Sequence, residues 1–216
     1  ENPAGSVDAV RALSRSIYNR PIARRVTSEI DAFRPDVVHV HNTWFALSSS
    51  AVQAAAAPGV PVVMTIHNYR LGCIGVDLFR DGAVCTACVG RSPVRGVVHA
   101  CYRNSRLQST VQAVEIGVTR ARGVLSRSVE RFVAPSRFMA DRLVDIGVPA
   151  ERLVVKPHFV PDPGARPTPP SASNEILFIG RLASGKGIDS LLAAWRIRRS
   201  APSERRLTII GDGPMA

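Results

Sequence analysis

The chain has 216 residues, room for one large domain or two small ones, and its 45% hydrophobic and 21% charged residues exclude general disorder. No apolar run is long enough for a membrane-spanning helix. The net charge of +11, almost all from arginine, favours anionic partners such as nucleic acid, anionic lipid or phosphorylated ligands, and an arginine-rich solvated surface explains it equally well.

The spacing of apolar residues predicts the first elements. Residues three and four apart indicate helices over 7–17 and 21–33. A β-branched run predicts a buried strand over 36–40. An Ala-rich helix over 46–57 and a second buried strand over 61–66 follow.

The next segment, residues 70–103, has no sustained period and holds all four cysteines. Helical spacing returns over 107–125, and a short strand is predicted over 132–134. A helix then runs from Ser136, which suits an N-cap, to Gly147, which suits the position after the last turn. A strand over 153–155 completes this part of the chain.

Residues 161–173 contain five prolines and are expected to form a linker. The linker separates a first domain, 1–160, from a shorter one, 174–216. Beyond it, strand, helix and strand are predicted at 175–179, 188–198 and 206–210. Alternating strands and helices predict an α/β protein with a parallel, doubly wound sheet, in two units.

Two predicted strands each end in His-Asn. His41 and Asn42 follow the strand over 36–40, and His67 and Asn68 follow the next one. Ligands of open α/β sheets bind at the carboxyl ends of the strands, so we expect these side chains at one edge. They suit hydrogen bonds to a sugar or a phosphate, and the alternative is that they satisfy loop backbone.

The strand over 175–179 is followed by a Gly-containing loop and a helix N-terminus, which favours an anion. Arg181 and Lys186 supply cations there, between Gly180 and Gly187. The loop is not a Walker loop, because that motif needs Ser or Thr directly after the lysine and here Gly187 follows. An ordinary basic turn is the alternative.

The motif Gly-Asp-Gly-Pro over residues 211–214 follows the last strand. Together with Gly180, Arg181, Lys186 and Gly187 it resembles the start of the C-terminal domain of family 4 retaining glycosyltransferases. These enzymes have the GT-B fold, two Rossmann-like domains facing across a cleft. Three segments of the first domain, 35–41, 65–68 and 133–136, are similar in order and spacing to strands of the family's acceptor-side domain.

The resemblance implies roles for these residues. Arg181 and Lys186, with Gly180 and Gly187 beside them, match the basic pair that holds the donor diphosphate, and no catalytic metal is expected. The nucleotide would lie near Gly211 and Gly213. His67 matches a histidine that contacts the donor sugar, and His41, Asn42 and Asn68 are expected on the acceptor side.

The implied activity is transfer of a hexose-type sugar from a nucleotide-sugar to a glycan or lipid-linked acceptor, with retention of configuration. We expect a role in glycan or cell-envelope polysaccharide biosynthesis, in the cytoplasm or at the inner face of the membrane, without nucleic acid. The family's Gly-rich loop and glutamate pair are absent, so we expect an N-terminal domain incomplete at its start, a truncated C-terminal domain and an inactive fragment. Two alternatives stay open: another GT-B nucleotide-sugar enzyme such as an epimerase, and a zinc-containing, Arg-rich nucleic-acid-binding module.

The cysteines are spaced C-x11-C-x2-C-x12-C, at Cys73, Cys85, Cys88 and Cys101. A C-x2-C pair is a common half-site for zinc, and four thiolates make a structural site. His99 is a substitute ligand. Free or redox-active cysteines and two disulfides are the alternatives, and a cytoplasmic location disfavours disulfides.

A basic cluster accompanies the cysteine segment and the helix after it. Its arginines are Arg91, Arg95, Arg103, Arg106, Arg120, Arg122 and Arg127. A surface of this kind is attracted to anionic lipid and suits a lipid-linked acceptor. A solvated helix face is the alternative.

Overall fold

The computed structural model describes residues 14–15, 17–43, 47–165, 169, 172–198 and 205–216. The chain divides into two compact units, Glu1–Phe159 and Val160–Ala216. The predicted helix over 7–17 lies largely outside the described residues.

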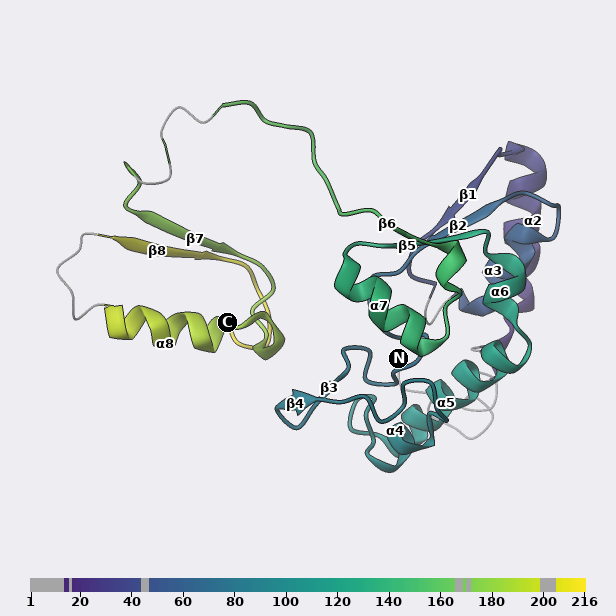
Figure 1. Cartoon of the computed structure of the whole chain (residues 1–216), viewed down its shortest axis with the longest axis horizontal. Coiled ribbons are helices and arrows are strands. Elements are labelled where there is room, and N and C mark those ends of the chain that lie inside the picture. The colour runs from purple at the N-terminus through teal and green to yellow at the C-terminus, as the bar shows by residue number, and fades with distance from the viewer. Residues whose placement is uncertain (1–13, 16, 44–46, 166–168, 170–171, 199–204) are drawn as a thin grey trace. The chain divides into compact units, whose positions relative to one another are not determined.

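A four-stranded parallel sheet forms the centre of the first unit (Figure 1). Its strands, in spatial order, are β1 (Val38–Val40), β2 (Val62–Thr65), β5 (Arg131–Ala134) and β6 (Leu153–Val155). Every neighbouring pair is parallel. The α/β class with a parallel sheet, predicted from short β-branched runs between helices, is therefore confirmed.

Helices pack around this sheet and close a core. Helix α3 (Ser48–Ala56) contacts β2 and α2 (Arg20–Phe33), whereas α7 (Arg137–Ile146) contacts β5 and β6. The almost fully buried core side chains include Val52, Val62, Val129, Phe132, Ala134 and Leu143. Burying such a set of apolar side chains is the main stabilising contribution to the unit.

The ends of α7 follow the sequence prediction. The Ser136 hydroxyl accepts a hydrogen bond from the Met139 N–H at 3.2 Å, which caps the first turn. Gly147 ends the helix in the left-handed conformation, with φ 105°, as glycine does most easily.

The single helix predicted over 107–125 is wrong, because two helices occupy the region. Helix α5 (Arg106–Ala121) ends at a turn, and α6 (Val124–Ser128) begins after Gly123. Gly123 has a φ of 57°, a left-handed conformation that interrupts the α-helical backbone. Apolar spacing continues across this turn, and the spacing alone therefore hides it.

The cysteine segment contains regular structure that its lack of period does not predict. Strands β3 (Phe79–Arg80) and β4 (Ala83–Val84) form an antiparallel hairpin, and a short helix, α4 (Val94–Val98), follows. Asp81 and Gly82 connect the strands with φ of 52° and 80°, as in a two-residue hairpin turn. Helix α4 packs against α5.

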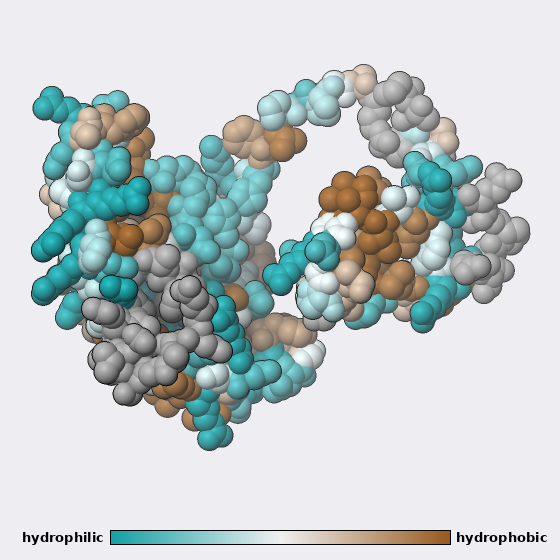
Figure 2. Space-filling model, turned by 180° about the vertical axis from the view of Figure 1, so that it is seen from behind, coloured by the Kyte–Doolittle hydropathy of each residue, from teal (hydrophilic) through white to brown (hydrophobic). Residues whose placement is uncertain are grey.

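The second unit is one strand–helix–strand motif. Strands β7 (Glu175–Ile179) and β8 (Arg206–Ile210) are parallel, with α8 (Ile188–Arg198) between them in the chain. These three elements match their predicted ranges. Large apolar side chains on this unit remain exposed, and Figure 2 shows them as brown surface.

Candidate functional site

Three histidines from three strand ends meet at the carboxyl edge of the four-stranded sheet. His41 follows β1, His67 follows β2 and His158 follows β6. The His41 Nδ1 and His67 Nε2 atoms lie 2.9 Å apart, at hydrogen-bond distance. The His67 ring stacks on His158 with the ring centroids 5.4 Å apart. The parallel sheet thus brings the two predicted His-Asn segments together.

A fourth histidine extends this cluster into the sheet. His39 lies on β1, with its ring centroid 4.4 Å from that of His41. Its Nε2 atom is 2.8 Å from the Thr65 hydroxyl on β2. Residues 39 and 41 share one face of the strand, because side chains alternate along it. The same alternation marks His39 in the sequence, although His39 was not among the predicted site residues.

The environment of the cluster favours the neutral form of two of its rings, those of His67 and His39. Burial lowers the pKa of His67, and the nearby His41, His158 and His39 lower it further. Burial, His41 and Lys156 lower the pKa of His39 in the same way. A neutral imidazole has one N–H donor and one acceptor nitrogen, which suits contact with a sugar hydroxyl.

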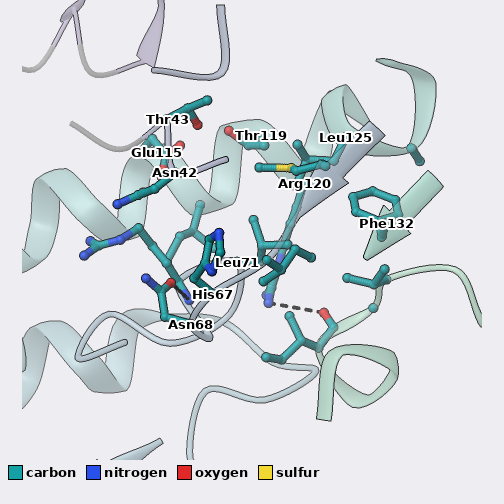
Figure 3. A pocket seen from close by; sticks show the side chains of 18 of the residues that line it. Asn42, Thr43, His67, Asn68, Leu71, Glu115, Thr119, Arg120, Leu125 and Phe132 are labelled. Carbon is teal, nitrogen blue, oxygen red and sulfur yellow. Dashed lines mark hydrogen bonds between the residues drawn. The ribbon is translucent and has the colours of Figure 1, made fainter. Parts of the chain in front are cut away.

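A cavity of about 430 Å³ opens beside these histidines. Its polar side includes His41, Asn42, His67, Asn68, Arg70 and Glu115, and its apolar side includes Ile66, Leu71, Ile116 and Phe132 (Figure 3). Apolar walls with a few polar groups, in this range of volume, are typical of small-molecule sites.

The two asparagines contribute differently. Asn42 lines the cavity. Asn68 also lines it, and its side-chain oxygen accepts a hydrogen bond from the Arg70 N–H at 3.1 Å. Asn68 therefore satisfies loop backbone, as the alternative interpretation expects, while it faces the cavity.

Helix α5 provides the wall opposite the strand ends. Gln112, Glu115, Ile116 and Thr119 lie on one helix face, at spacings of three and four. The Arg70 guanidinium donates a hydrogen bond to the Gln112 side-chain oxygen at 3.0 Å. Sequence reasoning did not select Glu115 as a site residue, although it is the only acidic residue of α5.

Glu115 is the most perturbed carboxyl group of the site. Burial raises its pKa to about 7, against the opposing effects of Arg70 and of a hydrogen bond from Thr119. Near neutral pH this carboxyl group therefore exists in both protonation states. Strongly perturbed groups that line a cavity are candidates for a functional role.

The second unit holds the predicted diphosphate loop. Arg181 and Lys186 are exposed, and Lys186 ends a short 3-10 turn (Ser184–Lys186) before α8. Gly187 then adopts a φ of 73°, which glycine tolerates without strain. Leu182 and Ile188 are buried and anchor the loop at both ends.

Gly211 and Gly213 have a packing reason to be glycine. A Cβ atom at Gly211 would overlap the Gly180 carbonyl, and one at Gly213 would overlap the Leu182 carbonyl. The Leu182 N–H donates to the Asp212 carbonyl at 2.9 Å, which joins the two loops. Gly180 therefore lies against Gly211 at the carboxyl ends of β7 and β8.

The four cysteines share one small region of the first unit. Cys73, Cys85, Cys88 and Cys101 all line a cavity of about 20 Å³, together with His99. All four are free thiols, without a disulfide. Within the described ranges, no three His, Cys, Asp or Glu side chains form a group that could hold a metal ion. Zinc binding stays a prediction.

One arginine of the predicted basic cluster, Arg120, is bound to backbone carbonyl groups instead of facing solvent freely. Arg120 donates to the Arg91 carbonyl at 3.0 Å, which ties α5 to the cysteine segment. It also donates to the Ile146 carbonyl at 3.4 Å, which ties α5 to α7 (dashed line in Figure 3). Arg120 is therefore structural. The other members, Arg91, Arg95, Arg103, Arg106, Arg122 and Arg127, are exposed. No helix in the described part of the chain has the length and apolar character needed to cross a bilayer.

Comparison with known proteins gives a family and two relatives. The model of Glycosyltransferase Family 4 matches residues 5–162. Glycogen synthases from Mycobacterium tuberculosis, strains CDC 1551 / Oshkosh and ATCC 25618 / H37Rv, are each 28% identical over 187 residues. The match covers 84% of this chain and 37% of each relative, so the chain spans well under half their length. No solved structure matches the chain significantly.

Proposed function

The chain belongs to Glycosyltransferase Family 4, and from this premise we propose that it transfers a sugar from a nucleotide-sugar donor to a glycan or lipid-linked acceptor with retention of configuration. Family membership favours a glycosyltransferase over the epimerase and the nucleic-acid-binding module. The protein would act in polysaccharide synthesis, in the cytoplasm, where nucleotide-sugar donors are made.

One observation carries the part of the proposal that concerns the first unit. His41 and His67 meet at 2.9 Å beside a cavity of about 430 Å³, at the carboxyl edge of a parallel sheet. Open α/β sheets bind ligands at this edge. His67 would contact the donor sugar near the reacting carbon, and His41, Asn42 and Asn68 would contact the acceptor.

The donor half rests on the loop after β7. Arg181 and Lys186 supply two cations next to the start of α8, where N–H groups also favour an anion. They would hold the diphosphate and stabilise the charge that develops on it as the sugar leaves. In this proposal no metal ion takes part in catalysis.

The relatives suggest which substrates to try first. Both are glycogen synthases, so a glucan is the first acceptor and a nucleoside diphosphate glucose the first donor. A lipid-linked acceptor is the other class, and the six exposed arginines of the basic cluster would attract an anionic leaflet. Flotation with phosphatidylglycerol vesicles, against phosphatidylcholine vesicles, distinguishes the two.

Calorimetry with UDP and ADP tests the donor site. The Lys186→Ala variant should bind the preferred nucleotide about 1–3 kcal/mol more weakly, the range for a contact with a charged group. Arg196→Ala, an exposed arginine near the other end of α8, is the matched control and should bind like the wild type. Equal affinity in all three proteins would remove Lys186 from the diphosphate site.

Turnover of the full-length protein tests His67. The His67→Ala variant should lose at least about 100-fold in kcat, as when one hydrogen bond to a reacting group is removed, while its melting temperature stays close to that of the wild type. A parallel loss of folding and activity would make His67 structural. The anomeric proton signal of the first-formed product shows whether configuration is retained.

A further inference from the structure

Glu115 lies where a charged side chain is unusual. It sits in the middle of α5, on the face whose other members Gln112, Ile116 and Thr119 are buried. Carboxyl groups are rarely buried unless they are paired, because an ionised carboxylate loses its hydration there. The position of Glu115 therefore needs a reason.

The surroundings hold this carboxyl group in place without neutralising it. Thr119, one turn along the helix, lies beside it on the cavity wall and lowers its pKa. Arg70 supplies nearby positive charge, while its guanidinium donates to Gln112 at 3.0 Å. In the described part of the chain, no cation lies within 4 Å of Glu115 to form an ion pair.

The free face of Glu115 is the cavity of about 430 Å³ beside His41 and His67. Figure 3 shows Glu115, Asn42, Thr43 and Thr119 among the side chains that line it. Carboxyl, amide and hydroxyl groups beside apolar walls are the combination that recognises a sugar ring, through its hydroxyls and its C–H faces.

We propose that Glu115 accepts a hydrogen bond from a hydroxyl group of the acceptor saccharide in this cavity and thereby determines which acceptor binds. This inference rests on the proposed function. A carboxyl group held on the cavity wall by α5 selects a ligand with a hydroxyl at one position, because an analogue without that hydroxyl leaves the half-buried carboxyl group unpaired.

A purely structural role would make different predictions. Glu115 would then serve to hold Arg70 and its loop against α5. Replacing it with glutamine would loosen the loop and lower the melting temperature, and saccharide binding would change only as far as folding does. The isosteric Glu115→Gln change separates these roles, because it keeps the shape and removes the charge.

The experiment measures saccharide binding to the chain by ligand-observed NMR and calorimetry. The probes are soluble tetrasaccharides of glucose, galactose, mannose and N-acetylglucosamine. Wild type, Glu115→Gln and Glu130→Gln are compared. Glu130, whose side chain is 62% exposed, is the matched control. UDP and ADP binding and the melting temperature are recorded for each protein.

The expected result is that one tetrasaccharide binds the wild type and the Glu130→Gln variant equally, and the Glu115→Gln variant about 10- to 100-fold more weakly. Nucleotide binding and melting temperature should not fall. Equal saccharide affinity in the three proteins would overturn the inference, and so would the absence of any probe binding to the wild type. Nucleotide binding would then still test the proposed function. Saccharide binding without nucleotide binding would overturn the proposed function alone.

Discussion

The two units of this chain use the same strand–helix–strand pattern and bury it to different degrees. In the first unit, Val52, Phe132 and Leu143 are almost fully buried in one core beneath the sheet. In the second unit, only Leu182 and Ile188 are buried among the described apolar residues, and Ile179 and Ile197 are 70% and 78% exposed. The hydrogen-bonded strands are equally regular in both.

This difference shows that a sequence pattern can predict a strand without predicting how stable that strand is. A β-branched run predicts a strand wherever it occurs, whereas stability depends on whether a second layer covers that strand. Two strands and a helix bury too little surface for much independent stability. The first unit should therefore carry most of the free energy of unfolding.

The largest effect should come from the core of the first unit. Phe132→Ala should lower its free energy of unfolding by about 3–5 kcal/mol, through lost burial and the cavity left behind. Leu177→Ala, at a side chain that is 55% exposed in the second unit, is the control and should change little. Amide exchange followed by mass spectrometry measures the stability over β5 and over β7 separately. Similar increases in exchange in both variants would contradict the difference between the two units.

The half-buried carboxyl group of Glu115 in the first unit should make its stability depend on pH. The pKa of Glu115 is raised from 4.5 to about 7 in the folded state, so the folded chain holds this proton more tightly than the unfolded chain. Stability from this group is present below pH 4.5 and is lost as the pH rises to about 7. Glu115→Gln should therefore be more stable than the wild type at pH 8, by up to about 3 kcal/mol, and equal to it at pH 4. Urea titrations at both pH values measure this, and an unchanged difference between them would contradict it.

The cysteine segment belongs to the first unit but, like the second unit, has few buried side chains and only short elements. It therefore tests whether burial decides stability within one unit. If the thiols bind zinc, purified protein should hold about one ion per chain. Chelation should then raise amide exchange over 85–101 about tenfold, or 1.4 kcal/mol, and leave β5 unchanged. Elemental analysis that finds no metal, with four titratable thiols, would remove the site. Cys85→Ser should lose the ion in the same assay.

The smallest effect is expected at the surface of the second unit. Glu175 and Arg206 are directly opposed on β7 and β8 and form an exposed ion pair. Solvent screens such pairs, so Glu175→Gln should leave amide exchange over β7 within experimental error. A clear rise in exchange would show that the second unit depends on its surface charges and not on apolar contacts.

The sequence predicted most elements, because their signals are local. Ser136 and Gly147 marked the two ends of α7 by their capping chemistry. The break at Gly123 was missed, since apolar spacing continues across the left-handed turn. The β3–β4 hairpin was also missed, although Asp81-Gly82 is a strong hairpin signal, because strands of two residues are too short to show an alternating pattern.

The sequence predicted those site residues whose positions follow from the order and direction of the strands alone. Parallel strands bring their carboxyl ends to one edge, and His41 and His67 therefore meet. The position of His158 depends on the path of the chain three residues beyond β6, which no local pattern encodes. The hydrogen bond from Arg70 to Gln112 joins residues 42 positions apart, and only the fold shows it.

The hydrogen bond between His41 and His67 couples the tautomers of the two rings. One proton lies between His41 Nδ1 and His67 Nε2. When this proton is on His41 Nδ1, a neutral His67 carries its own proton on its Nδ1 atom. When the proton is on His67 Nε2, the Nδ1 atom of a neutral His67 is an acceptor. A ligand that binds one ring through a donor or an acceptor therefore sets the proton position on the other. The two imidazoles act as one recognition element with two complementary states.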